Sequence, residues 1–311
     1  MNLIVVRFLL LASILSLALS AGAQDLPPVI DMHMHPVVEG LFLSDGSYAP
    51  IPCVPAGCEM RPSLVETKAD LRRLFFEAMD RNNIVMAALS DGETMENSYA
   101  WEKERPKSFI IGYGLWNPTA FDTTYLRQEY DAGRLDFIGE IAAQYRGFEA
   151  DTPELDQLYA LAELLDLPVL IHNSGTGAPS SRFKISQGHP EIIENVLMNY
   201  PGLRIWLENA AYPFLDEVIA LMYRYPNVYA DLSTISWLIP RAEFWRYLEA
   251  LVTAGLGNRL MWGSDSLWPG AIDIGLASIH DAPFLSQDQK RDILYNNAVE
   301  FLRLENAPTS N

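Results

Sequence analysis

The stretch TPELDQLYALAELLDLPVLIH, residues 152–172, contains one complete helix-and-strand unit. Its leucines recur at three- and four-residue intervals from Leu155 to Leu165, which predicts an amphipathic helix over Pro153–Asp166. The apolar run Val169–His172 follows and is continuous rather than alternating, as expected for a strand that is buried on both faces. A parallel sheet covered by helices is therefore predicted for this part of the chain.

The same rhythm of short apolar runs and amphipathic segments continues on both sides of this unit. Seven further candidate strands are Val29–Met34, Ile84–Leu89, Phe109–Leu115, Phe137–Ala142, Leu203–Glu208, Val228–Leu232 and Leu260–Trp262. Helix-like segments between or after them are Asp70–Arg81, Pro190–Tyr200, Pro213–Tyr225, Arg241–Ala254 and Gln287–Leu302. Eight β/α units in about 280 residues predict a single-domain (β/α)8 TIM barrel.

The composition agrees with a large folded domain and excludes several classes of protein. Of 311 residues, 49% are hydrophobic and 20% are charged, which excludes a disordered or fibrous chain. The net charge of −18 argues against a nucleic-acid partner, because phosphates require Lys and Arg. We therefore expect a small-molecule substrate rather than a nucleic acid.

The first 23 residues have the pattern of a secretory signal peptide. Arg7 precedes the apolar stretch Phe8–Leu19, and Ala21-Gly22-Ala23 offers small residues for cleavage. The alternative is an uncleaved membrane anchor. We expect cleavage, a mature domain over residues 24–311 that is periplasmic or secreted, and no stable membrane association afterwards.

Residues 37–63 are rich in Pro and Gly and are predicted to be a loop insertion over the mouth of the barrel. Cys53 and Cys58 lie in this segment, and in an oxidising compartment they are expected to form a disulfide. The alternative is two free, partly buried thiols.

Two histidines stand at the end of the first predicted strand, in Asp31-Met32-His33-Met34-His35-Pro36. Because strand side chains alternate, His33 and His35 point to the same side. At a barrel strand end that side is the mouth, where active sites lie. Two imidazoles there can hold a divalent ion, although a packed, hydrogen-bonded pair of histidines is the alternative.

Three other polar residues end predicted strands in the same way. Glu140 closes the fourth strand, His172 the fifth, and Asp265 follows the eighth. The C-terminal ends of barrel strands converge on one cavity, so these residues are predicted to share a metal site with the histidine pair. The alternative is a buried polar network without a metal.

These motifs together resemble the amidohydrolase superfamily of metal-dependent barrels, in its amidohydrolase-related (amidohydrolase 2) branch. The resemblance covers nearly the whole mature chain. It is carried by Asp31-Met32-His33-Met34-His35-Pro36, Gly139-Glu140-Ile141, Val169-Leu170-Ile171-His172, Trp262-Gly263-Ser264-Asp265 and the late segment Lys290–Ala298.

The resemblance implies a role for each of these residues. His33, His35 and His172 would be metal ligands, and Asp265 would be both a ligand and the base that takes the proton of a metal-bound water. Glu140 would be a further ligand that joins two metals, or a carboxylate that orients His172.

The chain departs from the family's pattern after the sixth strand, where relatives usually have a histidine. Glu208 and Asn209 stand there instead. Asn209 can orient a carbonyl by hydrogen bonding but cannot carry a proton at neutral pH, whereas Glu208 could bind a metal or move a proton.

The resemblance implies hydrolysis of an amide, ester or lactone with one or two divalent ions, Zn²⁺ first and Mn²⁺ or Fe²⁺ next. One alternative is a metal-dependent decarboxylase of the same superfamily, for which Arg146, Arg182 and Arg241 are candidate partners of an acidic substrate. Another alternative is a non-catalytic binding or scaffold protein with a vestigial site.

Overall fold

The computed structural model describes residues 26–36, 67–177, 182–266, 268–305 and 307–308. The predicted signal peptide, the predicted loop insertion over residues 37–63 and the predicted Cys53–Cys58 disulfide all lie outside these described residues. Within the described ranges, no helix is both long enough and apolar enough to cross a membrane.

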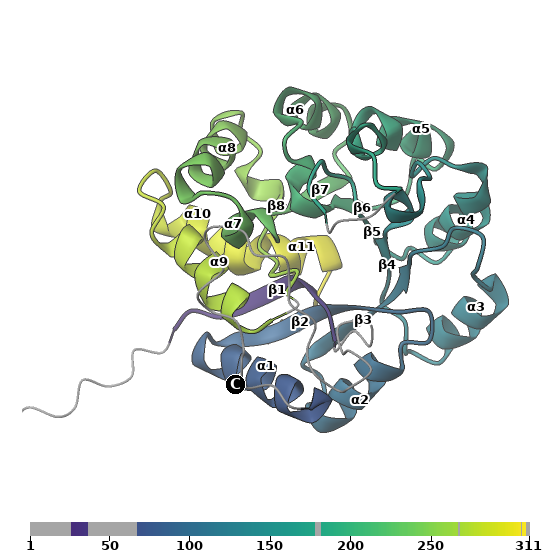
Figure 1. The fold of residues 1–311 in the computed structure, drawn as a ribbon, viewed down its shortest axis with the longest axis horizontal. Helices are drawn as coiled ribbons and strands as arrows, with labels where there is room; N and C mark the ends of the chain where they lie inside the picture. Colours follow the sequence, from purple (N-terminus) through teal and green to yellow (C-terminus); the bar gives the residue numbers. More distant parts are fainter. Residues whose placement is uncertain (1–25, 37–66, 178–181, 267, 306, 309–311) are drawn as a thin grey trace, which may run out of the picture.

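Eight parallel strands form one sheet in sequential order, and the sheet curls into a nearly closed barrel with helices around it (Figure 1). The Met32 amide donates to the Trp262 carbonyl at 3.0 Å, and Met34 and Ser266 form a parallel bridge, so the first strand also meets the segment after the last. The predicted single-domain (β/α)8 barrel is confirmed. The strands are β1 (Val29–Met34), β2 (Ile84–Asp91), β3 (Phe109–Leu115), β4 (Phe137–Ile141), β5 (Val169–Ile171), β6 (Ile205–Leu207), β7 (Val228–Asp231) and β8 (Leu260–Met261).

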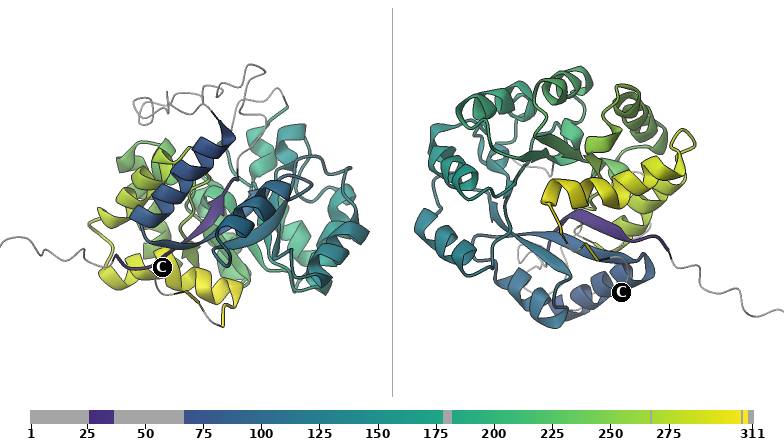
Figure 2. Two further views of the ribbon diagram at one scale, coloured as in Figure 1. Left: turned by 90° about the horizontal axis from the view of Figure 1, so that it is seen from below. Right: turned by 180° about the vertical axis from the view of Figure 1, so that it is seen from behind.

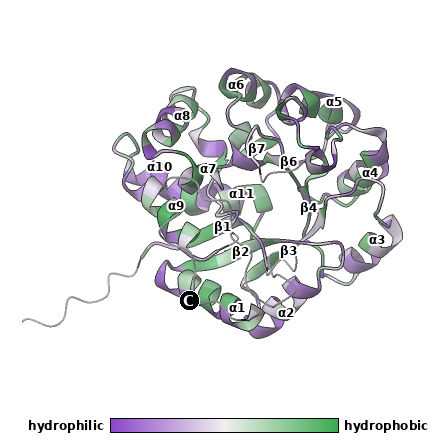
Figure 3. Cartoon of the chain, in the orientation of Figure 1, coloured by the Kyte–Doolittle hydropathy of each residue, from purple (hydrophilic) through white to green (hydrophobic). Residues whose placement is uncertain are grey.

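The helices form an outer ring, as the side and back views show (Figure 2). The strands are largely hydrophobic, and hydrophilic residues gather on the helices of the ring (Figure 3). The helices are α1 (Lys68–Arg81), α2 (Glu96–Glu104), α3 (Thr123–Asp131), α4 (Asp156–Leu164), α5 (Glu191–Asn199), α6 (Leu215–Arg224), α7 (Ile235–Leu238), α8 (Arg241–Thr253), α9 (Gly270–His280), α10 (Gln287–Arg291) and α11 (Asn297–Leu302). A π-helical stretch, Asp292–Asn296, joins α10 to α11.

Apolar side chains fill the end of the barrel where the strands begin. Trp206 of β6 is completely buried, with its ring 5.0 Å from Phe137 and 5.4 Å from Phe301 of α11. Seen from behind, α11 crosses this end of the barrel (Figure 2). The opposite end, where the strands finish, is therefore the one that carries the polar side chains.

A glycine in β4 lets this strand pass close to β5 just before Glu140. Gly139 has a φ of +142°, and a Cβ there would lie 2.6 Å from the Leu170 Cβ and 2.7 Å from the Leu170 carbonyl oxygen. A larger residue would clash with the neighbouring strand in a backbone conformation that L residues rarely adopt. Gly139 thus fixes where Glu140 enters the barrel mouth.

Candidate metal centre

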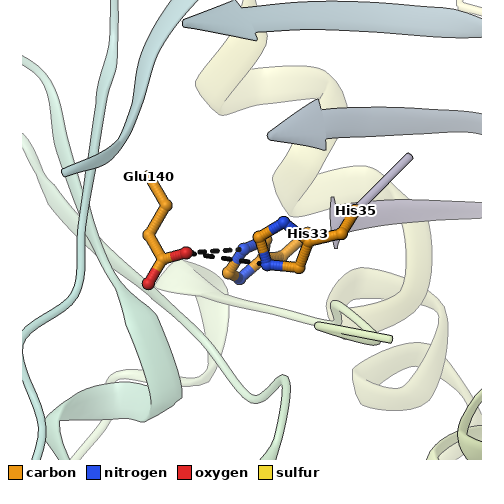
Figure 4. A group of neighbouring side chains, drawn as sticks. All are labelled: His33, His35 and Glu140. Atoms are coloured by element: carbon orange, nitrogen blue, oxygen red, sulfur yellow. Dashed lines mark ion pairs between the residues drawn. The ribbon is translucent and has the colours of Figure 1, made fainter. Parts of the chain in front are cut away.

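His33 of β1 and His35, which directly follows that strand, face the carboxylate of Glu140 across the barrel mouth (Figure 4). The ring Nδ1 of His35 lies 2.9 Å from the Ser90 carbonyl oxygen. A carbonyl only accepts hydrogen bonds, so Nδ1 carries the proton and Nε2 of the neutral ring presents a lone pair. This Nε2 lies 3.0 Å from Asp265 Oδ1 and 3.6 Å from Glu140 Oε2.

His33 is buried completely, and neither of its ring nitrogens has a hydrogen-bond partner within the described part of the chain. Its Nε2 lies 3.9 Å from Glu140 Oε2 and 3.8 Å from Asp265 Oδ1. Leaving buried polar atoms unpaired is costly. A cation between the two histidines and the two carboxylates would satisfy all four side chains, so these residues fit a divalent metal.

Asp265 is held in place by hydrogen bonds of both its backbone and its side chain. Its backbone N–H donates to the His33 carbonyl at 2.6 Å, and its Oδ2 accepts the Thr234 hydroxyl. Burial raises the pKa of Asp265, but the charges of His33 and His35 outweigh burial and hold this pKa below its ordinary value. Asp265 is thus an ionised carboxylate whose Oδ1 is directed at the histidine pair.

The same carboxylates favour a positive charge beside His35. Burial lowers the pKa of His35, but its hydrogen bond to Asp265 and the charges of Asp265 and Glu140 raise that pKa to about 9. The position next to Nε2 of His35 therefore attracts either a proton or a metal ion.

A second group lies on the β4–β6 side of the mouth, around His172. The Nδ1 of this ring is 2.8 Å from Glu140 Oε1 and 2.8 Å from Glu208 Oε2, and its Nε2 is 3.1 Å from the Thr176 carbonyl. Burial and the charge of Glu140 raise the pKa of Glu208 well above its ordinary value. Glu140 directs one oxygen to each group, which is compatible with both roles foreseen for it, as a bridging ligand or as a carboxylate that orients His172.

Asn209 does not face the cavity as a substrate contact would. Its side-chain amide donates to Glu208 Oε1 at 2.7 Å, and its Oδ1 accepts the Ile235 amide at 3.3 Å. The residue is buried and has a φ of +57°. In this arrangement the side chain of Asn209 holds the Glu208 carboxylate in place.

Asp231, which ends β7, is a further carboxylate near His33 that the sequence motifs did not single out. Its Oδ1 accepts hydrogen bonds from the backbone N–H of Asn209 and from the Ser233 hydroxyl, the latter at 2.5 Å. Its Oδ2 has no hydrogen-bond partner among the described residues. This Oδ2 lies 3.9 Å from His33 Nδ1. At this distance the charge of Asp231 favours the tautomer of His33 that has its proton on Nδ1, which would leave Nε2 free for a metal. The position of Asp231 at the end of a strand is the sequence feature that could have identified it.

Replacing Asp231 with Asn is expected to weaken metal binding about 10–100-fold, because the carboxylate that orients the His33 ring is lost. Competition with a chelator of known affinity measures the change. Asp288→Asn, on an exposed side chain of α10, is the matched control. Equal metal affinity in the Asp231→Asn variant and the parent would show that Asp231 does not position His33.

Arg241, which the sequence offered as a partner of an acidic substrate, lies elsewhere and pairs with Asp281 at 2.9 Å between α8 and α9. His189 also lies outside the centre, 3.8 Å from both Glu191 and Glu217. Of the aromatic residues, the ring of Tyr145 lies 4.8 Å from that of His172. Neither Tyr145 nor its neighbours Trp116 and Phe183 had been singled out in the sequence.

Comparison with known proteins places the chain in a family of barrel enzymes. The amidohydrolase family model (amidohydrolase 2) matches residues 30–304, so the chain belongs to the amidohydrolase family. Protein fluG of Emericella nidulans is 26% identical over 98 residues, a match that covers 32% of this chain and 11% of that protein.

Two solved structures share the fold at low sequence identity. A probable 2-pyrone-4,6-dicarboxylic acid hydrolase of Acinetobacter baumannii, with citric acid bound, has a TM-score of 0.63 and 14% identity, covering 89% of this chain and 99% of that one. A dihydroxybenzoic acid decarboxylase of Polaromonas sp. JS666, with manganese and 2-nitroresorcinol bound, has a TM-score of 0.61 and 13% identity, covering 90% and 98%. Structural neighbours thus include both hydrolases and decarboxylases.

Proposed function

We propose that the protein is an exported, metal-dependent hydrolase that cleaves an amide, ester or lactone bond in a small molecule. The observation that carries the proposal is the position of Asp265. This carboxylate lies 3.0 Å from His35 Nε2 and 3.8 Å from His33 Nε2, and the Thr234 hydroxyl fixes its other oxygen.

Four side chains would hold the metal: His33, His35, Glu140 and Asp265. A bound divalent ion lowers the pKa of its water from about 15.7 to about 7 and polarises a carbonyl oxygen. The mixed imidazole and carboxylate donors suit Zn²⁺, and also Mn²⁺ or Fe²⁺.

Asp265 is the proposed general base and acid. Because the pKa of Asp265 is held low, its carboxylate is ionised at neutral pH and can accept a proton from water. The side chain is 19% exposed, so water and a substrate can reach it. The same carboxyl then returns the proton to the leaving amine or alcohol.

The decarboxylase alternative needs cationic groups to hold an acidic substrate. Arg241, one of the candidates for this task, instead pairs with Asp281 at 2.9 Å on the outer helices. The sixth strand also ends in Glu208 where relatives have a histidine. Both features favour hydrolysis over loss of CO₂.

Turnover in ¹⁸O-labelled water distinguishes the reactions. The purified protein is given a panel of aryl esters, lactones and anilides, and separately a panel of hydroxylated aromatic acids. We expect one ¹⁸O atom in the carboxyl group of the acid released from the first panel, and no CO₂ from the second. Release of CO₂ from the second panel with no hydrolysis of the first would establish the decarboxylase instead. No turnover of either panel after metal loading would favour the binding protein.

A further inference from the structure

The short helix α7 and the residue before it hold the segment that carries Asp265. Thr234, which directly precedes α7, donates its hydroxyl to Asp265 Oδ2. Trp237, within the helix, donates its indole N–H to the carbonyl oxygen of Ser264 at 2.7 Å. One element between β7 and α8 thus fixes both the carboxylate of Asp265 and the peptide group in front of it.

The backbone of Asp265 has a conformation that needs this support. Its φ is +43°, in the left-handed region that residues other than glycine adopt at a cost. The peptide that joins Ser264 to Asp265 is bonded at both of its polar atoms. Its N–H donates to the His33 carbonyl at 2.6 Å, and its oxygen accepts the Trp237 indole. A residue in this region stays there only where its surroundings hold it, so these two bonds set the direction of the carboxylate.

Trp237 is itself held firmly. The residue is buried, and its ring meets that of Trp268 edge to face, with centroids 5.3 Å apart. Helix α7 packs against α9 (Figure 1), and the contact is close, since a Cβ on Gly275 of α9 would lie 2.8 Å from Ser236 Oγ. The indole N–H is therefore presented to the Ser264 carbonyl from a fixed position.

The packing of Trp237 does not by itself require the indole nitrogen. Phenylalanine at this position would keep an aromatic ring against Trp268 but would leave the buried Ser264 carbonyl without this donor. The same kind of bond exists away from the centre, where Trp245 of α8 donates its indole N–H to the Ser278 carbonyl of α9 at 2.8 Å. The two tryptophans allow the effect on Asp265 to be separated from the general cost of losing an indole bond.

We propose that Trp237 is a positioning residue, which holds the peptide before Asp265 so that the Oδ1 atom of Asp265 faces His33 and His35. This Oδ1 lies 3.0 Å from His35 Nε2 and 3.8 Å from His33 Nε2. Without the indole bond, the segment can leave its left-handed conformation and carry the carboxylate away from the two rings. The proposal rests on the proposed function, in which Asp265 binds the metal and transfers the proton.

Comparison of Trp237→Phe with Trp245→Phe in the full chain tests the proposal. Each substitution removes one indole N–H from a carbonyl, so we expect similar shifts in the temperature of unfolding. In competition with a chelator, Trp237→Phe should bind Zn²⁺ about 10-fold more weakly than the parent, because a ligand is displaced. At saturating Zn²⁺ its kcat should fall about 10–100-fold. KM should change little, because the buried indole nitrogen bonds to the protein's own backbone. Trp245→Phe should match the parent in Zn²⁺ affinity, kcat and KM.

A second variant keeps the shape of the side chain and tests the bond even if Trp237→Phe does not fold. In 3-benzothienylalanine a sulfur replaces the indole N–H, and its incorporation at position 237 should reproduce the weaker Zn²⁺ binding and the lower kcat. If this protein equals the parent in both quantities, Trp237 only packs and the proposal is wrong. Equal losses in Trp237→Phe and Trp245→Phe would also overturn it, because the effect would then not be local to Asp265.

The two readouts separate this proposal from the proposed function. Zn²⁺ affinity is measured without substrate, so a parent that binds Zn²⁺ but hydrolyses nothing contradicts the proposed function, while a weaker affinity in the variants still supports the role of Trp237. A parent that hydrolyses its substrate alongside variants that equal it contradicts only the role of Trp237. A parent that binds no Zn²⁺ would overturn both.

Discussion

The Asp265→Asn variant is expected to keep its fold and most of its metal while its rate of hydrolysis falls about 10²–10⁴-fold. Asparagine retains an oxygen that can face His35 and accept the Thr234 hydroxyl, but it cannot take up a proton. The fall should therefore appear in kcat, with KM little changed, because substrate binding does not depend on the proton transfer. Steady-state kinetics and metal analysis on the same preparation measure both quantities.

Asp281→Asn is the matched control, because this aspartate pairs with Arg241 between two outer helices. It should leave kcat unchanged. If Asp265→Asn hydrolyses the substrate at the parent's rate, Asp265 is not the base. If instead it loses its metal, the carboxylate charge is needed for binding, and its catalytic role must then be measured at saturating metal.

The His33→Ala variant should lose both metal and activity. His33 is buried, and among the described residues neither of its ring nitrogens has a hydrogen-bond partner. One nitrogen is directed at Glu140 and Asp265 and the other at Asp231. Removing the ring leaves these carboxylates facing one another with one ligand fewer. In the proposed mechanism the metal would activate the attacking water, so we expect hydrolysis to fall by at least about 10³-fold. Metal content after gel filtration and the rate at saturating substrate are the measurements.

His189→Ala controls for the loss of an imidazole that is not in the centre. His189 packs against Phe214, with ring centroids 4.7 Å apart. We therefore expect the His189→Ala variant to keep its full metal content. If His33→Ala binds as much metal as His189→Ala and hydrolyses the substrate at an unchanged rate, His33 does not belong to the proposed centre.

The sequence was sufficient for the barrel and for grouping most of the polar residues that meet at its strand ends. The strands are buried on both faces and therefore appear as continuous apolar runs, and all eight lie where those runs predicted them. Because the C-terminal ends of parallel strands converge, the polar residues at those ends could be grouped before any contact was known. His33, His35, Glu140 and Asp265 form one such group, and His172, Glu140 and Glu208 form another.

Other features left no readable pattern in the sequence. Helix α9 is apolar around most of its circumference, and α2 buries only Ser98 and Trp101, so neither has the stripe that periodicity detects. The carbonyls of Ser90 and Thr176, which fix the two histidine rings, are backbone groups and are independent of residue type.

The left-handed backbone at Asn209, which turns this side chain back onto Glu208, also depends on contacts made by distant residues. Its backbone amide donates to Asp231 on the next strand, and its Oδ1 accepts from Ile235 beyond it. Spacing along the chain cannot reveal such contacts, because they form only when β6 and β7 lie side by side.

The central claim is that a divalent ion held by His33, His35, Glu140 and Asp265 makes this protein a hydrolase. The most direct measurement is the rate of hydrolysis of one responsive ester or lactone as the metal is removed by chelation and then returned. We predict that the rate falls in proportion to the metal remaining on the chain, and that Zn²⁺ or Mn²⁺ restores it in the parent but not in His33→Ala. A metal-free protein that hydrolyses the substrate at the parent's full rate would contradict the claim.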